Sequence, residues 1–134
     1  MTTDLRVRVV RCVLPVALLA LTACGASSTT EPSMEAMRSE PRFDGTGPHH
    51  RAVTTSSSEA QEYFDQGLAF LYAFNHDEAI RSFHAAVAAD PECAMAWWGI
   101  AYASGPHINN PVVPTEREAE AYAAAREAMR LGGG

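Results

Sequence analysis

The sequence predicts an all-α fold, and three observations support that prediction. After Glu59, apolar residues recur at three- and four-residue spacing, which is the period of a helix that buries one face. Proline and glycine fall between these runs, where they end helices. Two similar runs, one starting at Tyr63 and one at Trp97, lie 34 residues apart, and self-similarity at roughly this period is typical of stacked helix–turn–helix repeats.

The first two predicted helices are separated by a turn at Asn75-His76-Asp77. Residues 56–58 offer N-caps for the first helix, which we expect from residue 59 to 74. Its apolar face consists of Tyr63, Phe64, Gly67, Leu68, Leu71 and Phe74. The second helix starts at about residue 77, and its buried side consists of Ala79, Ile80, Phe83, Ala86 and Val87.

Asp90-Pro91 ends the second helix and starts the third, because proline fits the first turn of a helix but not its interior. The third helix is expected to end near Ala103. A loop with three prolines follows at residues 105–114. Thr115 and Glu118 then predict a capping box at the start of an alanine-rich fourth helix that extends to residue 131.

The first 23 residues form a segment of a different kind. Three arginines precede an apolar stretch at residues 13–21, about half of the roughly 20 residues that a membrane-spanning helix needs. The sequence Leu21-Thr22-Ala23-Cys24 follows, and it resembles the lipobox of bacterial lipoproteins. In that family the cysteine is acylated and becomes the first residue after cleavage. The resemblance implies that residues 1–23 are a lipoprotein signal peptide and that a lipid on Cys24 anchors the exported chain to a bacterial membrane.

Residues 24–58 are rich in serine, threonine, proline and charge, and for most of them this composition predicts a flexible, disordered tether. Residues 48–53 are a candidate segment to lie against the first helix. The helical domain is expected at residues 59–134. After removal of residues 1–23 the chain has 15 acidic residues and 7 arginines, a formal net charge of −8, and no lysine. Such a balance argues against nucleic acid as a partner. With Cys24 acylated, Cys93 is left without an intrachain disulfide partner.

Residues 60–131 resemble tetratricopeptide repeats, whose pattern is W-x2-L-G-x2-Y, then A-x3-F and P. Gln66 is the one serious departure in the first copy. The resemblance implies a short α-solenoid of about two antiparallel repeats, at residues 60–93 and 94–131, with an enlarged loop at 105–114. The chain also looks like a group of little-characterised bacterial tetratricopeptide proteins. The predicted repeat-core residues are Tyr63, Gly67, Phe70, Ala79, Phe83, Ala86, Pro91 and Trp97.

The repeat period predicts a groove for a partner. Residues that are equivalent in successive repeats lie side by side in such a stack, and the first helices of the repeats line its concave wall in this family. The predicted partner-binding residues are Gln61, Phe64, Leu68, Met95, Trp98 and Tyr102. Rigid rings give a large contact area at low entropic cost. The alternative is that this stripe is core, covered by the tether or by further repeats.

A second candidate site is a polar edge, because turns inside successive repeats fall on the same side of the stack. His76 should therefore lie near His107, Asn109 and Asn110 of the long loop. Two imidazoles and two amides suit a polar ligand or half of a metal site. No histidine has the i, i+4 partner of a helical zinc pair, so we predict no metal and no cofactor.

Cys93 and His84 are interpreted as packing residues. A cysteine in the first turn of a helix is favoured as a thiolate by the dipole, but a lone small cysteine is more often buried. His84 is expected beside Ile80 and Val87. No nucleophile elbow and no glycine-rich phosphate loop is present, so the sequence gives no support for catalysis.

Together these patterns predict a membrane-anchored repeat scaffold that binds an envelope protein or peptide. The alternatives are an envelope metal-binding protein or enzyme with its site at the His76/His107 edge, and the N-terminal fragment of a longer repeat protein.

Overall fold

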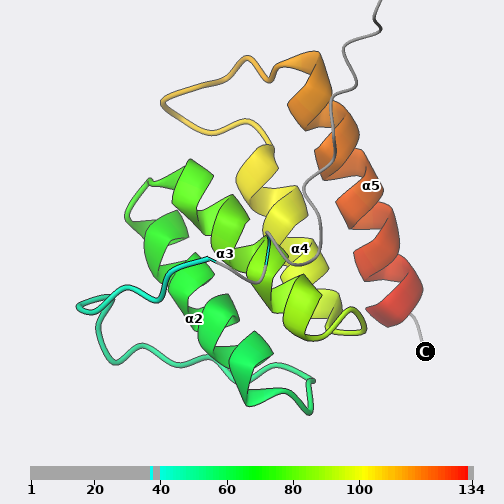
Figure 1. Ribbon diagram of the computed structural model, residues 1–134. Coiled ribbons are helices and arrows are strands. Elements are labelled where there is room, and N and C mark those ends of the chain that lie inside the picture. Colours follow the sequence, from blue (N-terminus) through cyan, green and yellow to red (C-terminus); the bar gives the residue numbers. More distant parts are fainter. Residues whose placement is uncertain (1–36, 38–39, 133–134) are drawn as a thin grey trace, which may run out of the picture. The chain divides into compact units, whose positions relative to one another are not determined.

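The computed structural model describes residue 37 and residues 40–132, and over these residues the fold is all-α, as predicted (Figure 1). Its four helices pack against one another, and the described residues contain no strand beyond an isolated bridge between His107 and Asn110. The helices are α2 (Ser58–Tyr72), α3 (His76–Ala89), α4 (Ala94–Ser104) and α5 (Thr115–Gly132).

Successive helices run antiparallel, so that α2 and α3 form one hairpin and α4 and α5 form another (Figure 1). The most extensive contacts lie within these two hairpins, and α3 joins them by packing on α4. Helix α2 also touches α4 directly.

Phe83 of α3 lies at the centre of the core, between α2 and α4. A Cβ added to Gly67 would come within 2.6 Å of its ring, and a Cβ added to Gly99 within 2.5 Å. Both distances are far below van der Waals contact, so only glycine lets these two helices approach the ring. The Phe64 ring also packs against Phe83, with its centroid 5.6 Å from that of the Phe83 ring.

The predicted repeat-core positions differ in how deeply they are buried. Tyr63, Gly67, Ala79, Phe83 and Ala86 are buried, whereas Phe70 and Trp97 are half-buried at the rim of the core. Pro91 is exposed, and its carbonyl oxygen accepts a hydrogen bond of 2.9 Å from Trp97 Nε1. The short α3–α4 connection is therefore fixed by the indole and not by burial of the proline ring.

The turn between α2 and α3 has an unusual residue at its key position. Phe74 has φ 62°, in the left-handed region, while the Asn75 N–H donates to the Phe70 carbonyl and the Phe74 N–H to the Leu71 carbonyl. These bonds define a Schellman motif, in which glycine normally occupies the left-handed position. A residue with a Cβ costs about 1–2 kcal/mol there.

One of the two predicted N-terminal caps is present, at α2, and the other, at α5, is not. Ser57 caps α2, since its Oγ accepts from the Ala60 N–H at 3.1 Å. The predicted capping box is wrong, because Thr115 is already helical and the Glu118 N–H donates to the Pro114 carbonyl at 2.9 Å. With Pro114 in the capping position, Thr115 lies one residue too late to act as the cap.

Residues 40–57, which we name the strap, have no helix or strand but lie along α2. Gln66 holds this segment: its Oε1 accepts from the Phe43 N–H at 2.9 Å, and its Nε2 donates to the Pro41 carbonyl and to Ser82 Oγ. The Phe43 ring meets Phe70 edge-on at 5.2 Å. The one departure from the repeat pattern is therefore the residue that fastens the strap.

Other α2 side chains continue the same attachment. Gln61 accepts from the Val53 N–H and donates to the Arg51 carbonyl, and Asp65 accepts from the Arg51 N–H at 3.0 Å. The Tyr63 hydroxyl donates to the Glu40 carbonyl at 2.7 Å. Residues 40–57, expected to belong to the tether, are thus packed on the domain, which extends upstream of its predicted start at residue 59.

Candidate functional site

The predicted groove is not formed as one continuous surface. Phe64 is 0% exposed and Leu68 is 2% exposed, and both belong to the hydrophobic core. Gln61 is half-buried and hydrogen-bonded to the strap. Placing Phe64 and Leu68 on an open wall was wrong, and for these two residues the alternative interpretation as core holds.

The α4 half of the predicted groove is at the surface. Trp98 is 37% exposed and Tyr102 is 61% exposed. Their rings stack at 5.2 Å with an interplanar angle of 22°. Met95 is half-buried and packs against the core beside them. Large rings that are held together outside the core give a preformed apolar contact surface.

Helix α5 contributes a second wall that the sequence analysis did not include. A hollow of about 520 Å³ lies between α4 and α5, and no charged side chain lines it. Its lining residues are Ala94, Met95, Trp98, Ala101, Ala125, Ala128, Met129 and Gly132. Met129 is 76% exposed. We name this surface, with Tyr102, the open face.

The polar edge brings together two of its four predicted residues. The His76 and His107 rings stack at 3.8 Å, with an interplanar angle of 9°. They border a hollow of about 540 Å³, which we name the edge hollow. Its lining residues are Leu71, Tyr72, Phe74, His76, Ala101, Tyr102, Gly105, Pro106, His107 and Ile108.

The two predicted asparagines have a different place. Asn109 and Asn110 are exposed and do not line the edge hollow. Asn110 exchanges two backbone hydrogen bonds with His107, at 3.1 and 2.9 Å, which close a tight turn in the loop. Asn110 thus helps to position the His107 ring through the backbone.

The histidine stack is poorly arranged for a metal ion. The lone pairs of an imidazole lie in the plane of its ring, and two nearly parallel planes 3.8 Å apart do not direct them to one point. A zinc ion requires ligand nitrogens at roughly 2.0–2.1 Å in a tetrahedral arrangement. Among residues 40–132, no cluster of three histidine, cysteine or carboxylate side chains has metal-binding proximity.

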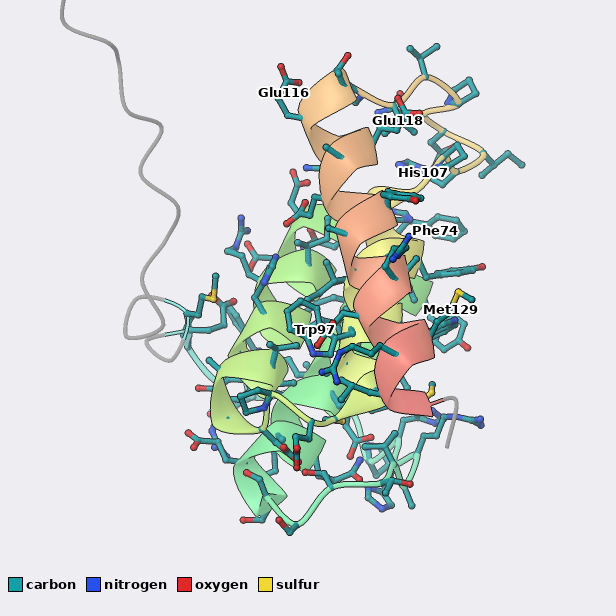
Figure 2. The ribbon with its side chains drawn as sticks, turned by 90° about the vertical axis from the view of Figure 1, so that its right-hand side faces the viewer. Phe74, Trp97, His107, Glu116, Glu118 and Met129 are labelled. Atoms are coloured by element: carbon teal, nitrogen blue, oxygen red, sulfur yellow. The ribbon has the colours of Figure 1, made fainter. Side chains whose placement is uncertain are left out.

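The edge hollow and the open face are continuous. Ala101 lines both hollows, and Tyr102 of the edge hollow stacks on Trp98 of the open face. Figure 2 shows Phe74, His107 and Met129 on one side of α5 and Trp97 on the other. One surface therefore extends from the α2–α3 turn along α4 to the end of α5.

Cys93 was predicted in the first turn of α4, but it lies at the N-cap before that turn. Its side chain is 0% exposed. Burial raises the pKa of this thiol, so the environment favours the neutral form. The interpretation as a small buried residue agrees with this environment.

A polar cluster behind the open face holds α5 in place. His84 Nε2 lies 2.8 Å from Glu120 Oε1, and Ser104 Oγ donates to Glu120 Oε2 at 3.4 Å. The hydrogen bond from His84 lowers the pKa of Glu120 below its ordinary value. One turn earlier in α5, Arg117 donates to Asp77 at 2.8 Å. The helical spacing around Ile80 and Val87 gave no indication of the His84–Glu120 contact, because its partner lies 36 residues away.

Comparisons of the chain with protein-family models, with curated proteins and with solved structures find no match. None of the helices in the described part of the chain combines the length and the apolar character that crossing a bilayer requires. Cys24 and the rest of the predicted signal peptide lie outside the described residues.

Proposed function

We propose that the protein is a lipid-anchored scaffold of the bacterial cell envelope, and that its helical domain binds a protein or peptide on the open face. The observation that carries this proposal is the exposed stack of Trp98 on Tyr102, continued by Met129 across an uncharged hollow. Apolar clusters with rigid aromatic anchors are typical of protein-binding surfaces.

A tetratricopeptide architecture agrees with the packing of the helices. Gly67 and Ala79 are buried where α2 and α3 meet, and the Phe83 ring fills the space beside them. These are the small and large positions of the repeat pattern. In this architecture a further helix pair would pack beside α4 and α5, so the open face also suits more repeats in a longer form of the chain.

Anchoring rests on the N-terminal pattern alone. The basic start, the short apolar stretch and the lipobox at Cys24 support export and acylation. Replacement of Cys24 by alanine is expected to move the protein from the membrane to the soluble fraction and to abolish incorporation of labelled fatty acid. Unchanged membrane association of the variant would contradict the anchoring part of the proposal.

The binding part is tested by photo-crosslinking in intact cells. A photoreactive amino acid replaces Met129 on the open face or, as a control, Ala123, an exposed α5 residue that lines neither hollow. We expect a defined envelope protein to be captured from position 129 and not from 123. Equal capture from both positions would contradict the proposal, whereas crosslinks within a longer form of the chain would indicate further repeats.

A further inference from the structure

The edge hollow is lined by aromatic rings and by no charged side chain. Tyr72, Phe74 and Tyr102 contribute aromatic rings to it, and no arginine, lysine or carboxylate lines it. Phe74 is 62% exposed, and its ring lies 6.3 Å from that of His76. The faces of phenyl and phenol rings carry negative potential and attract cations.

Phe74 is the least expected of these residues. It occupies the left-handed position of the α2–α3 turn, where glycine is unstrained, and its side chain lies outside the core. The ring therefore adds strain and gains little burial in return. Strained residues cluster at binding sites, and Phe74 borders a hollow.

The described part of the molecule carries a net negative charge. Residues 40–132 contain 13 carboxylates against 6 arginines, a formal net charge of −7. Glu116 and Glu118 begin α5, are exposed, and have no ion-pair partner among the described residues. The arginine between them, Arg117, is paired with Asp77. The hollow thus lies in a field that attracts cations and repels anions.

We infer that the edge hollow receives an arginine side chain of the protein partner whose apolar residues lie on the open face. This inference rests on the proposed function. A guanidinium group stacks flat on aromatic rings and is more weakly hydrated than an ammonium group, so it enters a ring-lined hollow at lower cost. Because Ala101 and Tyr102 join the two hollows, the arginine would follow closely after the apolar residues in the partner segment.

The test uses the full chain and two small probes, N-acetyl-arginine methylamide and its neutral analogue N-acetyl-citrulline methylamide. Binding is followed by NMR through the ring signals of His76, His107 and Tyr102. We expect saturable shifts with the arginine probe, an affinity at least five times that for the citrulline probe, and weakening by salt. Equal affinity for the two probes, or no saturable shift with either, would overturn the inference.

Two variants separate the role of the ring from stability. Phe74→Gly is expected to raise the melting temperature, because the strain is relieved, and to lower the affinity for the arginine probe at least fivefold. Tyr102→Leu should also weaken binding. Tyr122→Ala is the matched control, since Tyr122 is 66% exposed but does not line the hollow, and it should bind as the wild type does. Wild-type binding by Phe74→Gly would overturn the inference.

The two experiments distinguish failure of arginine binding in the edge hollow from failure of partner binding on the open face. If crosslinks from position 129 are retained while the arginine probe does not bind, the open face binds a partner without this contact. If neither is observed, both proposals fail.

Discussion

Phe64 in α2 and Trp98 in α4 occupy equivalent places in the 34-residue period, yet their surroundings differ. Phe64 is 0% exposed and Trp98 37%, and the next pair, Leu68 and Tyr102, differs in the same way at 2% and 61%. Large apolar residues stand at both of these equivalent positions in each helix. The difference therefore arises from what lies against each helix.

Helix α2 is covered on two sides. The core formed with α3 and α4 encloses Phe64, and the strap lies along its other side, held by Gln61, Asp65 and Gln66. Helix α4 packs on α3 and α5, but the described residues leave Trp98 partly and Tyr102 largely exposed. A period in the sequence thus predicts equivalent backbone positions, while burial depends on segments outside the period.

The largest expected change in the free energy of unfolding comes from removing Phe64, and the matched change is removal of the equivalent ring, Trp98. Phe64→Ala should reduce the free energy of unfolding by about 3–5 kcal/mol, because it leaves a cavity beside Phe83. Trp98→Ala should cost less than about 1.5 kcal/mol, because part of its ring is already in water. Urea denaturation followed by circular dichroism measures both. Equal losses would show that the open face is as much a part of the core as α2.

Removing the attachment of the strap should have the next largest effect. Gln66→Leu leaves the Phe43 N–H, the Pro41 carbonyl and the Ser82 hydroxyl without this partner, and we expect a loss of about 2 kcal/mol. Arg42 and Arg51 are exposed in the strap, so trypsin should cleave there faster in the variant. A cleavage rate unchanged from the wild type would show that the strap does not depend on Gln66.

At the side-chain contact between α3 and α5, Glu120→Gln should destabilise the domain by about 1 kcal/mol at pH 7, since the carboxylate is partly exposed and its pairing with His84 is screened. The pKa of Glu120 is lower in the folded state than its ordinary value of 4.5. Its stabilising effect is thus present above that value and is lost as the pH falls through the folded-state pKa. The difference between variant and wild type should therefore shrink at pH 3. Glu127→Gln, at a surface ion pair with Arg130, is the control and should show no measurable change.

The smallest expected change in stability comes from Glu40 of the strap, and its pH dependence is opposite to that of Glu120. Burial raises the pKa of Glu40, and one of its carboxyl oxygens is buried without a hydrogen-bond partner among the described residues. The stability that this group contributes is present below its ordinary pKa and is lost as the pH rises through the raised value. Glu40→Gln should therefore be slightly more stable than the wild type at pH 7 and equal to it at pH 3. A destabilised variant at pH 7 would show that the carboxylate is a favourable contact.

The sequence predicted those features that depend on helical spacing or on the stacking of successive hairpins. The core positions Gly67, Ala79 and Phe83 follow from helical periodicity, and the meeting of His76 with His107 follows from the rule that turns of successive hairpins share a side.

Features that depend on distant partners were missed. Gln66 looked like a departure from the pattern because its partners, Pro41 and Phe43, lie in a segment with no periodicity. Met129 was not included because the alanines around it indicated only packing. Phe74 was assigned to an apolar face, since sequence spacing does not reveal a left-handed turn.

Helix α5 meets its neighbours almost entirely through alanine and a few polar groups, and Ala124 is its one buried residue. Alanine has a single methyl group, so each α5 residue in this contact contributes few dispersion contacts, even though α4 and α5 meet extensively. We expect α5 to be the first helix to exchange its amide hydrogens. Separation of α5 from α4 would carry Met129 away from Trp98 and would widen the hollow between these two helices.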